Sequence, residues 1–282
     1  MTRLFGARYP IIQAPMATVS PPSLAAAVSN AGALGTIAGA ALSADELRAA
    51  IHEVRAATDA PFGVNLFAPP YVRDDQLQVV LDERPPVFSF TLGLIDPEQF
   101  AGMTVLGTAT TPEEARFLEA AGVDGVVAQG AEAGGHRGTF LGDFEESMIP
   151  LAELVPSIDV SVPVVAAGGI VDAADVKAAL ELGAQGVQIG TAFLFTPECA
   201  VPREHLDALR TYDTVVTPAY TGRHMRAART PVLDELMAGP PPLPFPQQRA
   251  VAAEVGPVYM GGTSAKRARE LPVAELVQSL VG

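Results

Sequence analysis

Eight short apolar segments alternate with helical segments before residue 195, and this alternation restricts the chain to very few folds. The predicted strands are Ile11–Met16, Ala33–Ala38, Gly63–Phe67, Val87–Leu92, Thr104–Thr108, Val123–Gln129, Val162–Ala167 and Gly186–Ile189. Helix ends are marked between them: Ser43 and Glu46 form a capping pattern. Gly183 follows a helix that begins near Asp172. Strands and helices in this order form a parallel sheet that is either closed or open.

The count of eight strands favours the closed form, a (β/α)8 or TIM barrel of the α/β class. A doubly wound open sheet would alternate in the same way, but no Gly-x-Gly-x-x-Gly follows the first strand. Hydrophobic residues make up 49% of the 282 residues and Trp is absent, so the core consists of small aliphatic side chains. Such a core suits buried parallel strands.

The alternation ends after Phe195. Thr196–Met237 has helical stretches and several arginines, Gly239–Pro246 is a Pro-rich turn or linker, and Ala265–Leu280 is an amphipathic helix. We therefore predict that residues 1–198 and 256–282 form the barrel. Residues 199–255 are predicted to form a small helical excursion that covers the barrel mouth.

Charge and cysteine content restrict partners and location. The net charge is −14 and only Lys177 and Lys266 are lysines, which argues against binding to nucleic acid or an anionic membrane surface. Cys199 is the single cysteine, so no intrachain disulfide can form and a reducing compartment is expected. No signal-peptide pattern or membrane-spanning apolar run is present, and we expect a cytoplasmic protein without membrane contact.

A glycine-rich segment, Ala128–Gly138, contains His136 and follows the sixth predicted strand. In βα barrels the residues that act on a ligand lie at the carboxyl ends of the strands. Imidazole is the side chain best suited to move a proton near neutral pH, and glycines remove side chains that would crowd a bulky ligand. His136 is therefore the candidate catalytic residue. No His, Cys or acidic spacing indicates a metal site.

The other strand ends carry uncharged polar groups and glycines, a set that suits a flat heterocycle with many donors and acceptors. These residues are Gln13, Ala14 and Met16 after the first strand, Asn65 in the third, Gln129 in the sixth, and Gln188, Ile189, Gly190 and Thr191 at the eighth. Gly168 and Gly169 follow the seventh strand. Loops after the last two strands form the usual phosphate site of this fold, so we predict phosphate binding there.

Together these segments resemble the nitronate monooxygenase family, FMN-dependent barrels formerly called 2-nitropropane dioxygenases. The resemblance is carried by Pro10–Met16, Phe62–Leu66, Val127–Gly138, Val164–Ile170 and Gly186–Leu194, with shorter similar segments at Thr221–Arg223 and Val258–Ser264. It implies that Met16 and Asn65 contact the flavin ring and that Gln129 hydrogen-bonds the flavin. It further implies a phosphate site formed by Gly134, Gly169, Gly190 and Thr191. Gln188 would help shape that site, and Ala14, Gly168 and Ile189 would adjoin the cofactor.

The resemblance also implies a reaction. Alkyl nitronates or nitroalkanes would be oxidised by dioxygen to a carbonyl compound and nitrite, with FMN as cofactor and His136 as the catalytic histidine. His136 would act either as the base that takes the proton beside the nitro group or as a group that orients the nitronate anion; the residues leave both roles open. Family members often carry a lysine after the fourth strand, and Gly93–Gly102 has none. A positive charge near the ring would then come from elsewhere. The partners are this small substrate and dioxygen, in a monomer or homodimer.

Other functions stay open on the same loops. An FMN-dependent enoyl-ACP reductase using NAD(P)H looks similar, but its family often has glutamate at the position of Gln129 and a residue other than arginine after the histidine. Gln129 and Arg137 therefore favour the nitronate enzymes. A flavin-binding protein without efficient chemistry is disfavoured by His136. A dehydrogenase of the inosine monophosphate type would need a cysteine in a barrel loop, where Cys199 is poorly placed.

Overall fold

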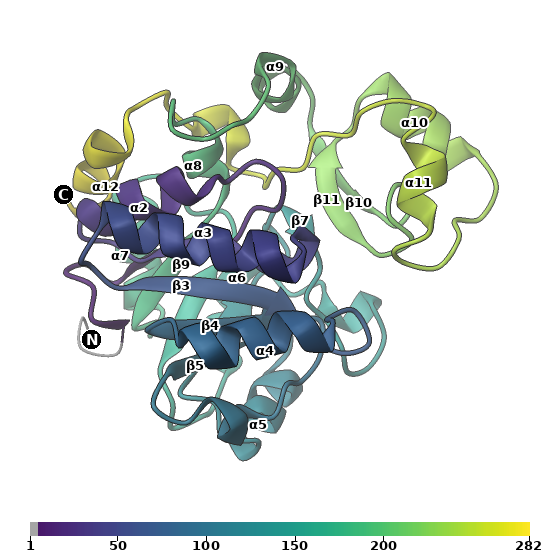
Figure 1. The fold of residues 1–282 in the computed structure, drawn as a ribbon. Helices are drawn as coiled ribbons and strands as arrows, with labels where there is room; N and C mark the ends of the chain where they lie inside the picture. Colours follow the sequence, from purple (N-terminus) through teal and green to yellow (C-terminus); the bar gives the residue numbers. More distant parts are fainter. Residues whose placement is uncertain (1–4) are drawn as a thin grey trace.

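A closed sheet of eight parallel strands forms the centre of the computed structural model, which describes residues 5–282 (Figure 1). The strands are β1 (Ile11–Gln13), β2 (Gly35–Ala38), β3 (Phe62–Phe67), β4 (Val87–Thr91), β5 (Thr104–Ala109), β6 (Gly125–Gln129), β8 (Val164–Ala167) and β9 (Gly186–Ile189). Neighbouring strands follow the order β1-β9-β8-β6-β5-β4-β3-β2. A parallel bridge between Ile12 and Leu34 joins the first strand to the segment that enters β2. The predicted TIM barrel is thereby confirmed.

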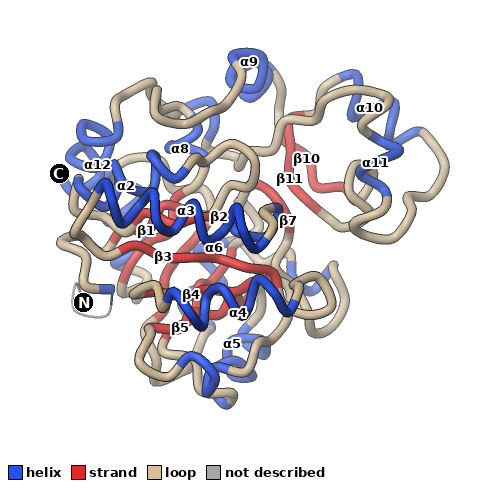
Figure 2. Tube along the Cα trace, in the orientation of Figure 1, coloured by secondary structure: helices blue, strands red, loops and turns tan. Residues whose placement is uncertain are grey.

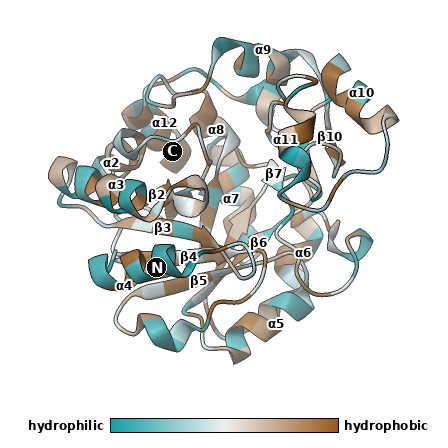
Figure 3. Cartoon of the chain, turned by 45° about the vertical axis from the view of Figure 1, so that its right-hand side comes forward, coloured by the Kyte–Doolittle hydropathy of each residue, from teal (hydrophilic) through white to brown (hydrophobic). Residues whose placement is uncertain are grey.

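Helices surround the strands on the outside (Figure 2). They are α2 (Pro22–Asn30), α3 (Ala44–Ala57), α4 (Asp74–Glu83), α5 (Pro112–Ala120), α6 (Leu151–Ser157), α7 (Ala173–Glu181) and the C-terminal α12 (Val273–Val281). The predicted capping box is present: Glu46 N donates to Ser43 Oγ at 3.2 Å, and Ser43 N donates to Glu46 Oε2 at 2.7 Å. A 3-10 turn, Pro97–Phe100, replaces a helix between β4 and β5. The outer helices carry both hydrophilic and hydrophobic residues, as expected for helices with one buried face (Figure 3).

The barrel interior changes from apolar to polar along the strands. Its lower layer is apolar and includes Ile12, Leu34, Val87, Leu106, Val127 and Val165. Because alternate side chains of a strand share one face, the residues two positions further on also point inward. On β4, β5 and β6 these are Ser89, Thr108 and Gln129. The apolar layer therefore supports a polar layer at the carboxyl ends of the strands, where the site was predicted.

The segment after the barrel strands contains strands as well as helices. It comprises α8 (Thr191–Leu194), α9 (Arg203–Thr211), β10 (Thr214–Thr217), β11 (Met225–Ala228), α10 (Pro231–Ala238) and α11 (Gln248–Ala252). In Figure 1, β10, β11, α10 and α11 form a lobe beside the barrel, which we call the mouth lobe. The excursion predicted as helical thus includes an antiparallel strand pair, which sequence patterns miss because strand pairing is non-local. The division at residues 198 and 255 stays a prediction.

Prolines mark where two helices begin, and one of them divides the segment Ala265–Leu280 that was predicted to be a single helix. The segment Phe144–Val155 contains a 3-10 turn, Glu145–Ser147, and α6 begins only after Pro150. The segment Ala265–Leu280 likewise contains a short turn before α12, which begins after Pro272. The residue before a proline avoids the helical conformation, so each helix starts at the proline. Among residues 5–282, no helix is both long and apolar enough to cross a bilayer.

Candidate active site

Inward-facing polar side chains at the strand ends are held by one another. Asn65 Nδ2 on β3 donates to Ser89 Oγ on β4 at 2.9 Å, and Thr91 Oγ1 lies 3.1 Å from Thr108 Oγ1 on β5. Asn65 is 5% exposed, so its amide is fixed at the base of the mouth rather than free in solvent. This part of the barrel offers a ready-oriented set of neutral donors and acceptors.

The loop that carries His136 is held by the side chain of Gln129. Gln129 Nε2 donates to the backbone oxygen of His136 at 3.0 Å, while Gly138 N donates to Gln129 Oε1 at 2.7 Å. His136 itself lies in a two-residue strand, β7 (Gly135–His136), which pairs antiparallel with β11 so that Met225 is opposite His136. The candidate catalytic residue is therefore positioned by the barrel and by the mouth lobe together. The predicted contact of Gln129 with a flavin stays a prediction.

The buried side chain of Arg137 binds backbone oxygens on both sides of this loop. The residue is 1% exposed; its Nη1 donates to Gly130 O at 2.6 Å, and its Nη2 donates to Gln129 O at 3.1 Å and Ser147 O at 2.7 Å. Burial, and then the charge of Arg226, lower the pKa of Arg137 to about 10, so it stays a cation at neutral pH. The loop geometry around His136 thus rests on a buried guanidinium bound to neutral carbonyl groups.

Aromatic rings enclose the imidazole. The ring centroid of His136 lies 6.1 Å from that of Phe67 and 5.2 Å from that of Phe245, both in edge-on arrangements. Phe245 in turn lies 4.9 Å from Tyr71. Phe245 belongs to the Pro-rich segment that was predicted to be a turn or linker, and sequence reasoning missed it. A phenylalanine flanked by prolines was the available signal, but its place at His136 depends on the fold.

Burial and neighbouring cations keep His136 neutral. Burial first, and then the charges of Arg223 and Arg249, lower the pKa of His136 to about 4. Arg223 donates to two backbone oxygens, those of Arg137 at 3.4 Å and of Thr139. Within residues 5–282, neither Arg223 nor Arg249 forms an ion pair with a carboxylate. The positive charge beside His136 is thus carried by arginines rather than by a lysine.

The opposite side of the mouth presents backbone rather than side chains. Gly168 and Gly169 follow β8 with φ of 122° and 75°, a region that favours glycine. In the part of the chain that the structure describes, the N–H groups of Gly169, Gly190 and Thr191 donate no hydrogen bond. Unpaired N–H groups in loops after adjacent strands suit an anion such as a phosphate.

Pairing of β1 with β9 brings the first strand end to this site. Ile12 is opposite Gln188, and a Cβ atom added to Gly190 would lie 3.3 Å from Ala14 Cβ and 3.8 Å from Met16 Sδ. Gln188 is half-buried, and its side chain lies on the inward face of β9. Ile189 is 1% exposed and its side chain packs in the outer apolar layer, so only its backbone is available to a cofactor.

Sequence reasoning assigned no role to Gly261 and Gly262, yet they close this side. Gly262 N donates to Thr191 Oγ1 at 2.9 Å. A Cβ atom on Gly134 would lie 2.5 Å from Gly261 C and Gly262 N, so the glycine loop and the 261–262 segment are in backbone contact. Their position in Val258–Ser264, a family-like segment, was the signal that could have found them. Gly134 and Thr191 therefore both lie next to Gly262, and their part in binding a phosphate stays a prediction.

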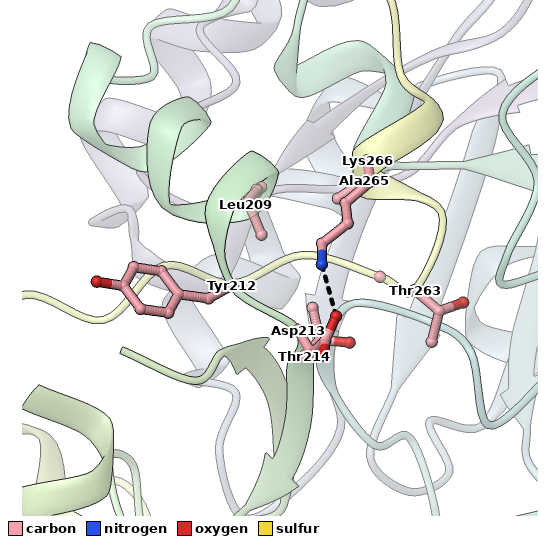
Figure 4. A pocket seen from close by; sticks show the side chains of 8 residues that line it. Leu209, Tyr212, Asp213, Thr214, Thr263, Ala265 and Lys266 are labelled. Atoms are coloured by element: carbon pink, nitrogen blue, oxygen red, sulfur yellow. Dashed lines mark hydrogen bonds and ion pairs between the residues drawn. The ribbon is translucent and has the colours of Figure 1, made fainter. Parts of the chain in front are cut away.

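A cavity of about 180 Å³ lies on another side of the 261–262 segment (Figure 4). It is lined by Leu209, Tyr212, Asp213, Thr214, Gly262, Thr263, Ala265 and Lys266. Lys266 Nζ lies 2.6 Å from Asp213 Oδ1, so the lysine charge is compensated. None of the predicted site residues lines this cavity, although Gly262, which borders the mouth, does.

The single cysteine takes no part in the site. Cys199 is buried, its Sγ donates to Val19 O at 3.0 Å, and burial raises the pKa of the thiol to about 11. A thiol with a raised pKa is a poor nucleophile at neutral pH. The structure thus agrees with the sequence in giving no cysteine nucleophile at the barrel mouth.

The fold and the site define a βα-barrel enzyme whose mouth joins unpaired backbone donors on one side to an enclosed imidazole on the other. The family model for nitronate monooxygenase matches residues 1–76 and 71–282, and the chain belongs to this oxidoreductase family. Among its relatives, the nitronate monooxygenase of Pseudomonas aeruginosa is 42% identical, over 99% of this chain and 97% of that protein. The nitronate monooxygenase of Paraburkholderia phytofirmans is 36% identical, over 98% and 92% of the two chains.

Solved structures agree with this assignment. Nitroalkane oxidase from Streptomyces ansochromogenes is similar with a TM-score of 0.90 at 37% identity, covering 99% of this chain and 96% of that one. FabK from Thermotoga maritima is similar with a TM-score of 0.83 at 33% identity, covering 99% and 93%.

Proposed function

We propose that this chain is an FMN-dependent enzyme that oxidises alkyl nitronates or nitroalkanes with dioxygen, releasing a carbonyl compound and nitrite. The observation that carries the proposal is the neutral imidazole of His136, enclosed by Phe67 and Phe245 at the barrel mouth. Neutral imidazole can accept a proton, and a small apolar enclosure suits a short nitroalkane. Membership of the nitronate monooxygenase family supports the same reaction.

The donors and acceptors at the mouth fit FMN. Met16, Asn65 and Gln129 are proposed to meet the flavin ring, and the phosphate is proposed to bind at Gly134, Gly169, Gly190 and Thr191. Ala14, Gly168, Gln188 and the backbone of Ile189 adjoin the same site. The unpaired N–H groups of Gly169, Gly190 and Thr191 support the phosphate position. When bound, FMN supplies the redox chemistry, while the protein binds, orients and encloses the reactants.

The side chains around His136 divide the remaining tasks. His136 takes the proton from the carbon beside the nitro group, or orients a substrate that already is the anion. Phe67 and Phe245 keep water from the imidazole. Arg223 and Arg249 attract an anionic substrate or stabilise the anion as it forms, because no carboxylate pairs with them among the described residues.

Two measurements on the purified protein test this function. The absorbance spectrum should show a bound flavin, identified as FMN after release. Nitrite should then be released from nitroethane or from its anion in the presence of dioxygen. The second candidate, an enoyl-ACP reductase, is tested by oxidation of NADH or NADPH with an enoyl thioester. Strong turnover in that assay without nitrite release would overturn the proposal.

The working form of the protein is proposed to be a cytoplasmic monomer or homodimer. The single buried Cys199 supports a reducing compartment. Sedimentation of the flavin-loaded protein would give its oligomeric state, and a tetramer or larger assembly would contradict this part of the proposal.

A further inference from the structure

Thr221 contacts one ring nitrogen of His136. Its hydroxyl oxygen lies 3.1 Å from His136 Nε2, and the residue is 1% exposed. The same hydroxyl donates to Arg223 O at 2.9 Å, and Arg223 N donates to it at 3.4 Å. All three contacts fall on one oxygen atom in the turn that leads into β11.

The direction of the single proton on this oxygen decides which nitrogen of the imidazole carries a proton. A hydroxyl has one proton and two lone pairs. The carbonyl of Arg223 has no proton to give, so the hydroxyl proton lies on that bond, and Arg223 N–H occupies one lone pair. The remaining lone pair faces His136 Nε2, which must therefore donate. We propose that Thr221 is a positioning residue that holds the proton of neutral His136 on Nε2 and leaves Nδ1 as the free lone pair.

Thr221 is itself fixed by its neighbours. Gly222 has a φ of 82°, and a Cβ atom there would lie 2.2 Å from Leu243 O, so the turn packs directly against the Pro-rich segment. Gln248 fastens that segment, because its Nε2 donates to Ala219 O at 2.9 Å and its Oε1 accepts from Leu243 N at 2.9 Å. These contacts hold the backbone of the turn, and with it Thr221, beside the imidazole.

The tautomer decides between the two roles left open for His136, a base that takes the substrate proton or a group that orients the anion. This step rests on the proposed function. Nδ1 has no hydrogen-bond partner among residues 5–282, so it is the ring nitrogen left to meet a substrate. A lone pair cannot donate a hydrogen bond to a nitronate, but it can take a proton. The carbon–hydrogen bond beside the nitro group breaks, its electron pair stays on the substrate as the nitronate, and the proton forms a new bond to Nδ1. The resulting imidazolium still donates through Nε2 to Thr221.

The tautomer can be read directly, without any substrate. The flavin-loaded protein, labelled with 15N in the ring nitrogens of its histidines, is examined by long-range proton–nitrogen correlation at neutral pH. His136→Asn identifies the signals of His136 among the 4 histidines. We expect a protonated Nε2 and an unprotonated Nδ1. A proton on Nδ1, or on both nitrogens, would overturn the proposal.

A matched pair of variants tests the consequence for the reaction. Thr221→Val keeps the shape but removes the hydroxyl, and Thr221→Ser keeps the hydroxyl. We expect Thr221→Val to lower kcat with nitroethane roughly tenfold with little change in KM, because part of the imidazole adopts the wrong tautomer. The nitroethane anion, which needs no proton removal, should be affected less. Thr221→Ser should restore kcat to within about twofold of the unmodified enzyme.

The outcomes distinguish this proposal from the proposed function. Equal kcat values for Thr221→Val and the unmodified enzyme would overturn the positioning role of Thr221. If no nitro compound were turned over at all, the proposed function would fail, and the nitrogen signals of His136 would still decide the tautomer. If Thr221→Val did not fold, the signals of the unmodified protein would decide it alone.

Discussion

The two sides of the barrel mouth differ in which part of the polypeptide they present. After β8 and β9 the chain offers backbone N–H groups at glycines, with a φ of 75° at Gly169. After β6 it offers side chains: His136 between two aromatic rings, with arginines behind it. On the backbone side, one added methyl group can block ligand binding. On the side-chain side, single substitutions can change the chemistry of the site one residue at a time.

Among these variants, His136→Asn should have the largest effect, because it should remove nearly all activity without releasing the flavin. Asparagine keeps a polar group but cannot accept the substrate proton, so we expect nitrite release from nitroethane to fall by about 10²- to 10⁴-fold. The flavin should remain bound, because His136 is not among the residues proposed to hold the cofactor. Initial rates and the absorbance spectrum of the same sample measure both effects. Loss of flavin together with activity would show that the two sides are not separate.

The reverse change is Gly134→Ala, at the point where the glycine loop after β6 touches the 261–262 segment that borders the backbone side. Its Cβ atom would lie 2.5 Å from the backbone of Gly261 and Gly262, which must then move. We expect FMN to bind at least about tenfold more weakly, since a 1.4 kcal/mol loss is enough for this. Titration of FMN into the cofactor-free protein gives the Kd. Gly183→Ala is the control for backbone strain alone, because Gly183, unlike Gly134, has a positive φ, but an added Cβ there meets no atom within 4 Å.

Arg137→Met tests how much the buried guanidinium stabilises the loop that carries His136. Methionine has a similar length but cannot donate to the three carbonyl groups that Arg137 binds. Buried acceptors without donors should lower the free energy of unfolding by about 3 kcal/mol. Urea unfolding followed by circular dichroism measures this loss. A surface control is Arg203→Met, whose ion pairs with Asp207 and Glu270 are exposed, so its loss should be much smaller than that of Arg137→Met. Equal losses in both variants would contradict a special role for Arg137.

The smallest expected effect is a shift in pH dependence in Arg249→Gln. The pKa of His136 is lowered to about 4, so the ring stays neutral as the pH falls from 7 and is protonated only near pH 4. If His136 is the base, kcat/KM should fall on the acid side through that pH. Removing the positive charge of Arg249 should raise the pKa of His136, and the acid limb should move to higher pH. An unchanged or lowered midpoint would contradict this electrostatic explanation.

Sequence patterns could predict the barrel because each strand and helix end is a local feature. Apolar runs, the capping box at Ser43 and the glycines after the strands need no distant partner to be recognised. His136, Gly190 and Thr191 were accessible for the same reason, since the carboxyl ends of barrel strands meet at one face.

The remainder depends on contacts between segments far apart in the chain. Phe245 lies beside His136. The Pro-rich segment that carries it packs directly on the backbone of Gly222, where any side chain would be in the way. Thr221 could not be connected with the imidazole before β11 was known to pair with β7. Gly262 reaches Thr191 from the end of the mouth lobe, and no local pattern indicates that approach. Non-local pairing of this kind leaves only weak signals in a single sequence.

The short ladder of β7 with β11 limits how chimaeras of such barrels can be built. A transplanted lobe would have to keep Met225 opposite His136, because a slip by one residue reverses the direction of every side chain in a strand. Insertions in the outer loops of the lobe leave that alignment intact. A single residue gained or lost between Thr221 and Met225 would move the Thr221 hydroxyl away from His136 Nε2, even if every barrel residue were unchanged.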